Sequence, residues 1–138
     1  MNHEISFGYN GGMSFKGEVN GHELILDAEA DFGGNDLGPR PKPLILVGLI
    51  GCTGMDVISL LKKMRVPFTD FKVSANGELT EEHPKYYHKI ELTYDIYGKD
   101  LDRAKVEKAV NYSMERYCGV TAMLEKAAKI THIINYHE

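Results

Sequence analysis

The sequence predicts a mixed α+β fold in which strands and helices follow one another in blocks. Short segments of alternating apolar and polar residues crowd the first thirty positions, and the period becomes helical after residue 43. Alternation then returns in two later segments and at the end of the chain. The expected order is βββ–α–ββ–α–α–β, which is typical of α+β proteins and not of alternating β–α–β folds.

The N-terminal third is expected to form a three-stranded meander. Its alternating segments cover residues 4–9, 13–19 and 22–28. Asn10-Gly11-Gly12 and Asn20-Gly21 separate them with residues that tolerate positive φ, as tight hairpins require. Residues 30–42 are rich in glycine and proline and are expected to form a loop.

Residues 44–65 are expected to form a long helix. Pro43 suits its first turn, where a missing N–H costs nothing. The half that ends at Cys52 is apolar on every side, and the second half is amphipathic. A helix that is apolar all round must be enclosed, and a 138-residue chain has little core to spare. A second subunit is therefore expected to cover part of it.

The remainder of the chain is expected to contain three strands and two helices. Alternation predicts strands over 68–75, 86–96 and 130–136, and helical spacing predicts helices over 101–117 and 120–127. The size and the shared apolar content of these segments predict one domain over residues 1–138.

Composition excludes several functional classes. Twenty acidic and 16 basic side chains leave a net charge of −4, which argues against nucleic acid as a partner. The longest apolar run is far shorter than the roughly 20 residues of a membrane span. The N-terminus lacks the charged-then-apolar pattern of a secretory leader, so a cytoplasmic protein without a membrane partner is expected.

The two cysteines, Cys52 and Cys118, are the candidate reactive residues. They lie far apart in the sequence without metal-type spacing, so they are either buried packing thiols or a long-range redox pair. Gly48, Gly51 and Gly54 recur around Cys52, and such glycines imply close packing or space for a ligand on that face. Cys118 is expected to precede a short helix whose N-terminus would favour a thiolate.

Other site chemistries have no support in the sequence. The six histidines form neither an HxH nor an HExxH pattern, and no glycine-rich phosphate-binding motif occurs. No metal and no cofactor are expected.

The two cysteine segments together resemble the OsmC/Ohr family, and the YhfA-like branch of it most closely. The first cysteine stands in Gly51-Cys52-Thr53-Gly54-Met55-Asp56-Val57, and the second in Glu115-Arg116-Tyr117-Cys118-Gly119-Val120. The resemblance covers essentially the whole chain. It implies an OsmC-like α+β fold, with antiparallel sheets around long central helices in an intertwined homodimer.

The resemblance also implies thiol-dependent reduction of organic hydroperoxides. In that scheme Cys52 is oxidised by the peroxide to a sulfenic acid, Cys118 resolves it as a disulfide, and a dithiol reductant regenerates the pair. The alternative is a family member that binds a small apolar or thiol ligand at the dimer interface. The family's arginine and glutamate have no counterpart at Met13 or at Lys42-Pro43, which leaves Arg40, Lys42 and Arg116 as candidate cations.

Overall fold

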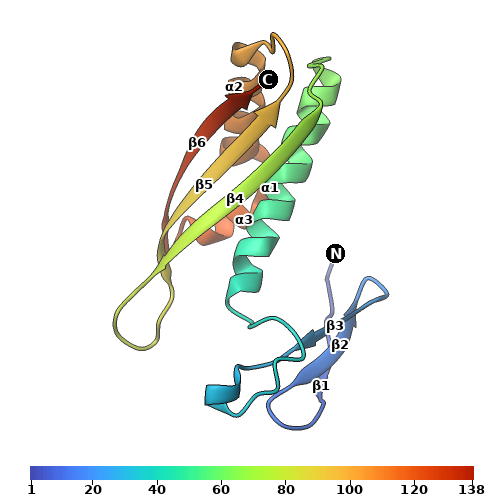
Figure 1. The fold of residues 1–138 in the computed structure, drawn as a ribbon, viewed down its shortest axis with the longest axis vertical. Helices are drawn as coiled ribbons and strands as arrows, with labels where there is room; N and C mark the ends of the chain where they lie inside the picture. The colour runs from blue at the N-terminus through green and yellow to red at the C-terminus, as the bar shows by residue number, and fades with distance from the viewer. The chain divides into compact units, whose positions relative to one another are not determined.

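The structure, a computed structural model, describes all residues from Met1 to Glu138 and confirms the mixed α+β class (Figure 1). The chain divides into two compact units, Met1–Ile45 and Leu46–Glu138, which are described separately.

The first unit contains the predicted three-stranded meander. The strands are β1 (Phe7–Tyr9), β2 (Phe15–Val19) and β3 (His22–Leu26), and they pair antiparallel in the order β1-β2-β3. They are shorter than expected. Asn20 and Gly21 turn the second hairpin with φ values of 53° and 80°, the conformation for which these residue types are favoured.

The loop after β3 is organised around one buried carboxylate. Asp27 accepts hydrogen bonds from the backbone N–H groups of Ala28, Asn35 and Leu37 at 2.7, 3.1 and 3.1 Å. These N–H groups, that of Leu37 foremost, lower the pKa of Asp27. The loop, expected over 30–42, also contains a 3₁₀ turn, Ala30–Phe32.

The long helix α1 (Pro43–Lys63) begins at the predicted proline. It ends shortly before Arg65, whose φ of 58° stops the helix in the left-handed conformation. One face of α1 is fully buried at four-residue intervals by Leu49, Thr53, Val57 and Leu61. By length and composition α1 is also apolar enough to cross a membrane, and only 22% of its most apolar 18-residue window is buried within the chain. Three large apolar side chains of α1, those of Ile45, Val47 and Met55, are exposed.

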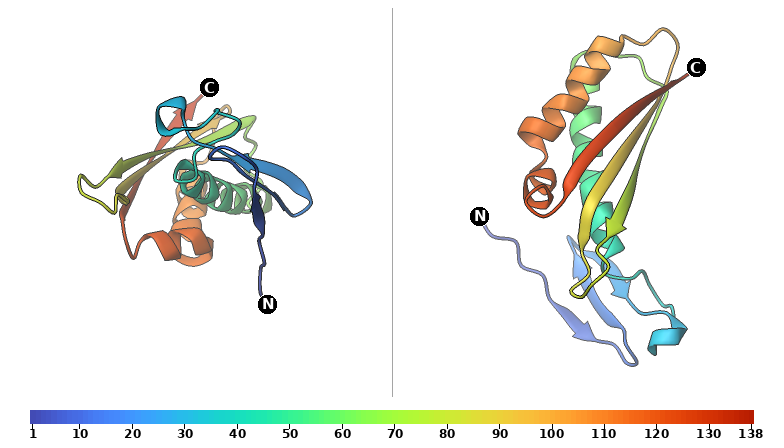
Figure 2. Two further views of the ribbon diagram at one scale, coloured as in Figure 1. Left: turned by 90° about the horizontal axis from the view of Figure 1, so that it is seen from below. Right: turned by 90° about the vertical axis from the view of Figure 1, so that its left-hand side faces the viewer.

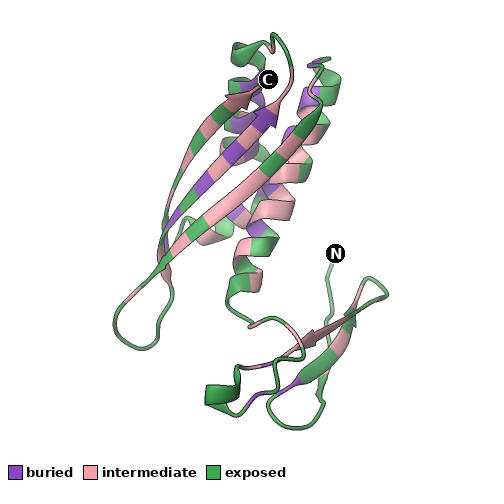
Figure 3. Ribbon diagram, in the orientation of Figure 1, coloured by how far each residue is buried: buried purple, intermediate pink, exposed green.

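The second unit is built on a sheet whose central strand is β5 (Tyr87–Tyr97), flanked by β4 (Asp70–Leu79) and β6 (Lys129–His137). Alternate residues of β5 are buried, as Figure 3 shows; they are Ile90, Leu92, Tyr94 and Ile96. Both α1 and α2 (Arg103–Tyr112) cover the same face of this sheet (Figure 2). The core of the unit lies between that face and the two helices.

Strand β6 pairs parallel to β5, while β4 pairs antiparallel to it. The expectation of wholly antiparallel sheets is therefore wrong for this strand. A parallel neighbour requires a long crossover connection, and the helical segment between β5 and β6 provides it.

That helical segment differs from the two helices predicted over 101–117 and 120–127. Helix α2 is capped by the Asp102 side chain, which accepts from the Lys105 N–H at 3.3 Å, and it stops at Tyr112. A π-helical turn, η2 (Ser113–Tyr117), follows, and then the short helix α3 (Gly119–Leu124). Cys118 sits between η2 and α3. Such π turns occur frequently at functional sites.

Candidate functional site

The structure brings the two predicted site residues together. The Sγ atoms of Cys52 and Cys118 and a carboxylate oxygen of Asp56 all lie within 4.8 Å of one another, and both thiols are free. Cys52 and Asp56 are one turn apart on α1, and Cys118 lies at the junction of η2 and α3. Asp56 was not among the site residues predicted from the sequence. Its four-residue spacing from Cys52 on a predicted helix was the signal that could have found it.

The two thiols differ in their surroundings. Cys52 is half-buried, whereas Cys118 is only 4% exposed. The Cys118 Sγ accepts a hydrogen bond from the Thr121 N–H at 3.4 Å, which caps α3, and the Cys118 N–H donates to the Ser113 carbonyl at 2.8 Å. Backbone contacts on both sides thus hold Cys118 in place.

Burial raises the pKa of the Cys118 thiol, and the nearby Cys52 raises it further, while the hydrogen bonds from Thr121 act in the opposite direction. Cys118 is therefore a neutral thiol at neutral pH. The N-terminus of α3 favours the thiolate through the Thr121 contacts, as expected, but desolvation outweighs them.

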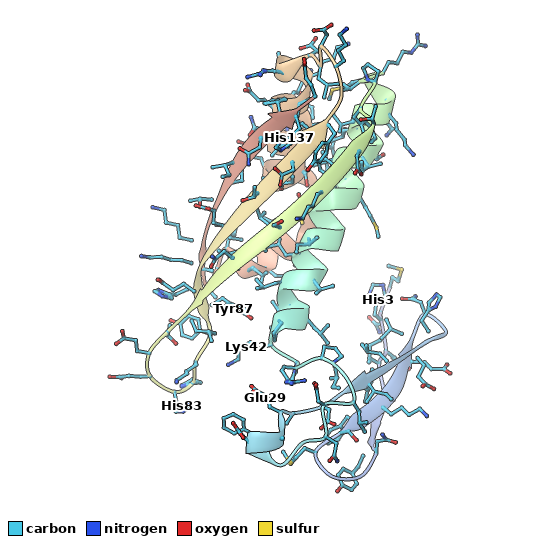
Figure 4. All side chains as sticks on the ribbon, viewed as in Figure 1. His3, Glu29, Lys42, His83, Tyr87 and His137 are labelled. Carbon is cyan, nitrogen blue, oxygen red and sulfur yellow. The ribbon has the colours of Figure 1, made fainter.

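The three candidate cations have other positions or partners. The Arg116 guanidinium lies over the Tyr112 ring, 4.7 Å from its centroid. Arg40 is bonded to Asp36 and to the Gly38 carbonyl in the first unit. Lys42 is exposed just before α1 (Figure 4). Arg116, the one of the three that belongs to the same unit as Asp56, forms no salt bridge with it.

A buried chain of hydroxyl groups leads to Asp56. Ser113 Oγ donates to Asp56 Oδ2 at 3.1 Å, Thr53 Oγ1 lies 2.8 Å from Ser113 Oγ, and the Tyr94 hydroxyl lies 2.7 Å from Thr53 Oγ1. Each hydroxyl has a single proton. Since Ser113 donates to the carboxylate, Thr53 donates to Ser113, and Tyr94 donates to Thr53.

This order of donors is consistent with the ionisation of Tyr94. Burial raises the pKa of Tyr94 to about 12, so its hydroxyl keeps its proton at neutral pH. Thr53, Ser113 and Tyr94 are all fully buried, and every buried polar side-chain atom has a partner. The pairing of Thr53 with Tyr94 and Ser113 was not predicted from the sequence, because it joins residues far apart in the chain.

Cys52, Asp56 and Cys118 are also the residues that could hold a metal ion. Two thiols and a carboxylate are ligands that Zn²⁺ accepts. Two histidines of the second sheet each pair with one acidic residue instead. His88 lies 2.9 Å from Glu78, and His137, labelled in Figure 4, lies 2.8 Å from Asp95.

Two free thiols held side by side on an α+β scaffold define a dithiol protein. The chain belongs to the family described as OsmC-like protein, whose sequence profile matches residues 33–133. It is similar to Protein YhfA of Escherichia coli strain K12, with 38% identity over 122 residues and 88% of each chain covered.

Two solved structures show the same fold. A hypothetical protein from Aquifex aeolicus VF5 is 31% identical, with a TM-score of 0.84 over 100% of this chain and 99% of that one. An organic hydroperoxide resistance protein OsmC from Legionella pneumophila is 15% identical, with a TM-score of 0.70 over 96% and 97%. At that identity the Legionella structure shows a shared fold alone.

Proposed function

We propose that this protein is a thiol-dependent peroxidase that reduces organic hydroperoxides through a redox cycle of Cys52 and Cys118. The observation that carries the proposal is the placement of two free sulfur atoms within 4.8 Å of each other in a folded chain. Membership of the OsmC-like family supports it, and so does the fold shared with the Legionella organic hydroperoxide resistance protein. Cytoplasmic detoxification during oxidative stress is the corresponding cellular role.

The different burial of the two thiols suggests their order of action. Cys52 is half-buried and can be reached by a hydroperoxide, whereas Cys118 is enclosed and neutral. The Cys52 thiolate attacks the distal oxygen of ROOH, the O–O bond breaks, and the alkoxide takes a proton to leave as ROH. Cys52 is thereby oxidised to a sulfenic acid.

Cys118 then resolves the sulfenic acid. Its sulfur attacks Cys52 Sγ, the S–OH bond breaks, and water leaves with the Cys118 proton. The sulfur atoms must approach from their present separation to about 2.05 Å to form the bond. A dithiol reductant regenerates the pair by attack on the disulfide, which is reachable at the half-buried Cys52.

A thiol titration tests this function. Reduced protein treated with one equivalent of cumene hydroperoxide is expected to lose both free thiols and to lose the mass of two hydrogen atoms, with one cumyl alcohol formed. The same treatment with cumyl alcohol is the control. Retention of both thiols after prolonged exposure would contradict the peroxidase function and favour the alternative, a ligand-binding member of the family.

We also propose that the protein acts as a homodimer in which a second copy covers the open face of α1. A groove of about 580 Å³ on this face is lined by apolar and small residues and by Lys62. They include Ile50, Gly51, Gly54, Met55 and Ile58. Met55 is 75% exposed, and a side chain added at Gly48 or Gly51 would meet no atom of the chain within 4 Å. The close packing expected around these glycines is thus not provided within one chain.

Gly51→Leu is expected to convert the dimer to a monomer. One copy has room for the new side chain, so the variant chain can fold, but a closely packed second copy would clash with it. Light scattering should give twice the 15.5 kDa chain mass for the wild type and the single chain mass for the variant. Lys72→Leu, on an exposed position of β4, is the matched control and should stay dimeric. A monomeric wild type would contradict the assembly and leave the groove as a ligand site.

A further inference from the structure

We propose that Asp56 is the proton acceptor of the resolving step: its carboxylate takes the proton of the Cys118 thiol as Cys118 attacks oxidised Cys52, and returns it to the departing oxygen. The inference rests on the proposed function in one respect: it requires Cys118 to form a disulfide with oxidised Cys52.

The need for a proton acceptor follows from the burial of Cys118. A thiolate is the attacking form of cysteine, and the Cys118 side chain lies in a site where it is only 4% exposed. Enclosed in this way, it has little access to water as a base. A base must therefore come from the protein, within reach of the sulfur.

Asp56 meets the requirement of position. Its carboxylate lies within 4.8 Å of the sulfur atom of Cys118 and of that of Cys52. A small side-chain movement or one bridging water closes the gap between the Asp56 carboxylate and the Cys118 sulfur. Catalytic contacts are often long before the reacting groups engage. Asp56 is placed on α1 near both the Cys118 sulfur, which gives the proton, and the Cys52 sulfur, which loses the oxygen.

The surroundings of Asp56 leave one carboxylate oxygen free for this task. Ser113 donates to Oδ2, at the end of the Tyr94–Thr53–Ser113 chain of hydroxyl groups, which fixes the carboxylate. The other oxygen accepts no hydrogen bond from the second unit, Leu46–Glu138, and no lysine, arginine or histidine of that unit forms a salt bridge with Asp56. One oxygen is anchored, and the other is available to a proton.

The step balances without a further reactant. The S–H bond of Cys118 breaks, its proton moves to Asp56, and its sulfur electron pair forms the S–S bond with Cys52. The S–O bond of the sulfenic acid breaks, and the departing hydroxide takes the proton from Asp56 to leave as water. Asp56 ends the step as the carboxylate, as it began.

Asp56→Asn tests the proposal because the amide keeps the shape of the side chain and its contact with Ser113 but cannot take a proton. After one pulse of cumene hydroperoxide, Cys52 should still be oxidised. Disulfide formation should slow by about a hundredfold, the usual size of general acid–base effects, and Cys52 sulfenic acid should accumulate for trapping by dimedone. Asp56→Glu keeps a carboxylate and should restore most of the rate.

A second assay separates this inference from the peroxidase function. 5,5′-Dithiobis(2-nitrobenzoate) converts Cys52 to a mixed disulfide, and attack by Cys118 releases a second nitrothiobenzoate ion. That second release should be about a hundredfold slower in Asp56→Asn than in the wild type. It should be absent in Cys118→Ser, which is the control.

The outcomes are distinguishable. If the wild type does not consume hydroperoxide but the second release still depends on Asp56, the peroxidase function fails and the role of Asp56 stands. If Asp56→Asn, with an unchanged melting temperature, forms both disulfides at wild-type rates, the role of Asp56 is overturned. If both Asp56→Asn and Asp56→Glu have lowered melting temperatures and form disulfides equally slowly, Asp56 has only a structural role. That result would also overturn the proposal.

Discussion

Cys52→Ser is expected to abolish the consumption of organic hydroperoxides. The reacting thiolate is absent in this variant, and a serine hydroxyl is not ionised at neutral pH. Cys118 cannot replace Cys52, because it is enclosed and its pKa is raised by burial. The rate of loss of cumene hydroperoxide in the presence of a dithiol should fall at least a hundredfold, to that of the reductant alone.

Cys118→Ser is the informative counterpart of that variant. It retains the attacking thiol and should complete one turnover, so that one equivalent of alcohol is formed and Cys52 is left as a sulfenic acid that dimedone labels. Equal rates of hydroperoxide loss in the wild type and in Cys52→Ser would contradict the assignment. Cys52 would then be a packing residue of α1.

Leu61→Ala is expected to produce a large loss of stability. Leu61 is fully buried in the last turns of the helix, among the residues that pack against the second sheet. Deleting its side chain leaves a cavity, and such deletions cost about 2–5 kcal/mol of unfolding free energy. For a domain of this size that is a large part of the total stability.

Chemical denaturation measures this loss, and Leu79→Ala is its matched control. Leu79 lies at the end of β4 and is 41% exposed, so the same truncation there should cost less than about 1 kcal/mol. The two variants remove identical atoms and differ only in burial. Similar losses in both would show that the core does not lie between α1 and the sheet.

The local pattern of residues was sufficient to predict most elements. Alternation predicted the strands because a half-buried strand shows one face to the core at every second residue. Pro43 and the apolar run after it predicted where α1 begins, since these signals act within a few residues. The two cysteine segments likewise selected Cys52 and Cys118 as candidate site residues from short stretches of chain, and the fold places their sulfur atoms close together.

The tertiary structure decided what depends on residues far apart in the sequence. The parallel pairing of β6 with β5 follows from the crossover that α2, η2 and α3 make, and alternation is the same in parallel and antiparallel strands. The end of α2 at Tyr112 and the π turn after it were not visible in a pattern that stays helical through Tyr117.

The tertiary structure also decided the chemistry of the site. Sequence indicated that Cys118 would precede a helix, which favours a thiolate, but only packing showed that burial outweighs that effect. The contacts of Thr53 with Tyr94 and Ser113 span 41 and 60 positions of the chain. Asp56 acquires its place beside both sulfur atoms only when η2 is packed against α1. Ionisation depends on desolvation and on neighbours in space, and neither is determined until the chain has folded.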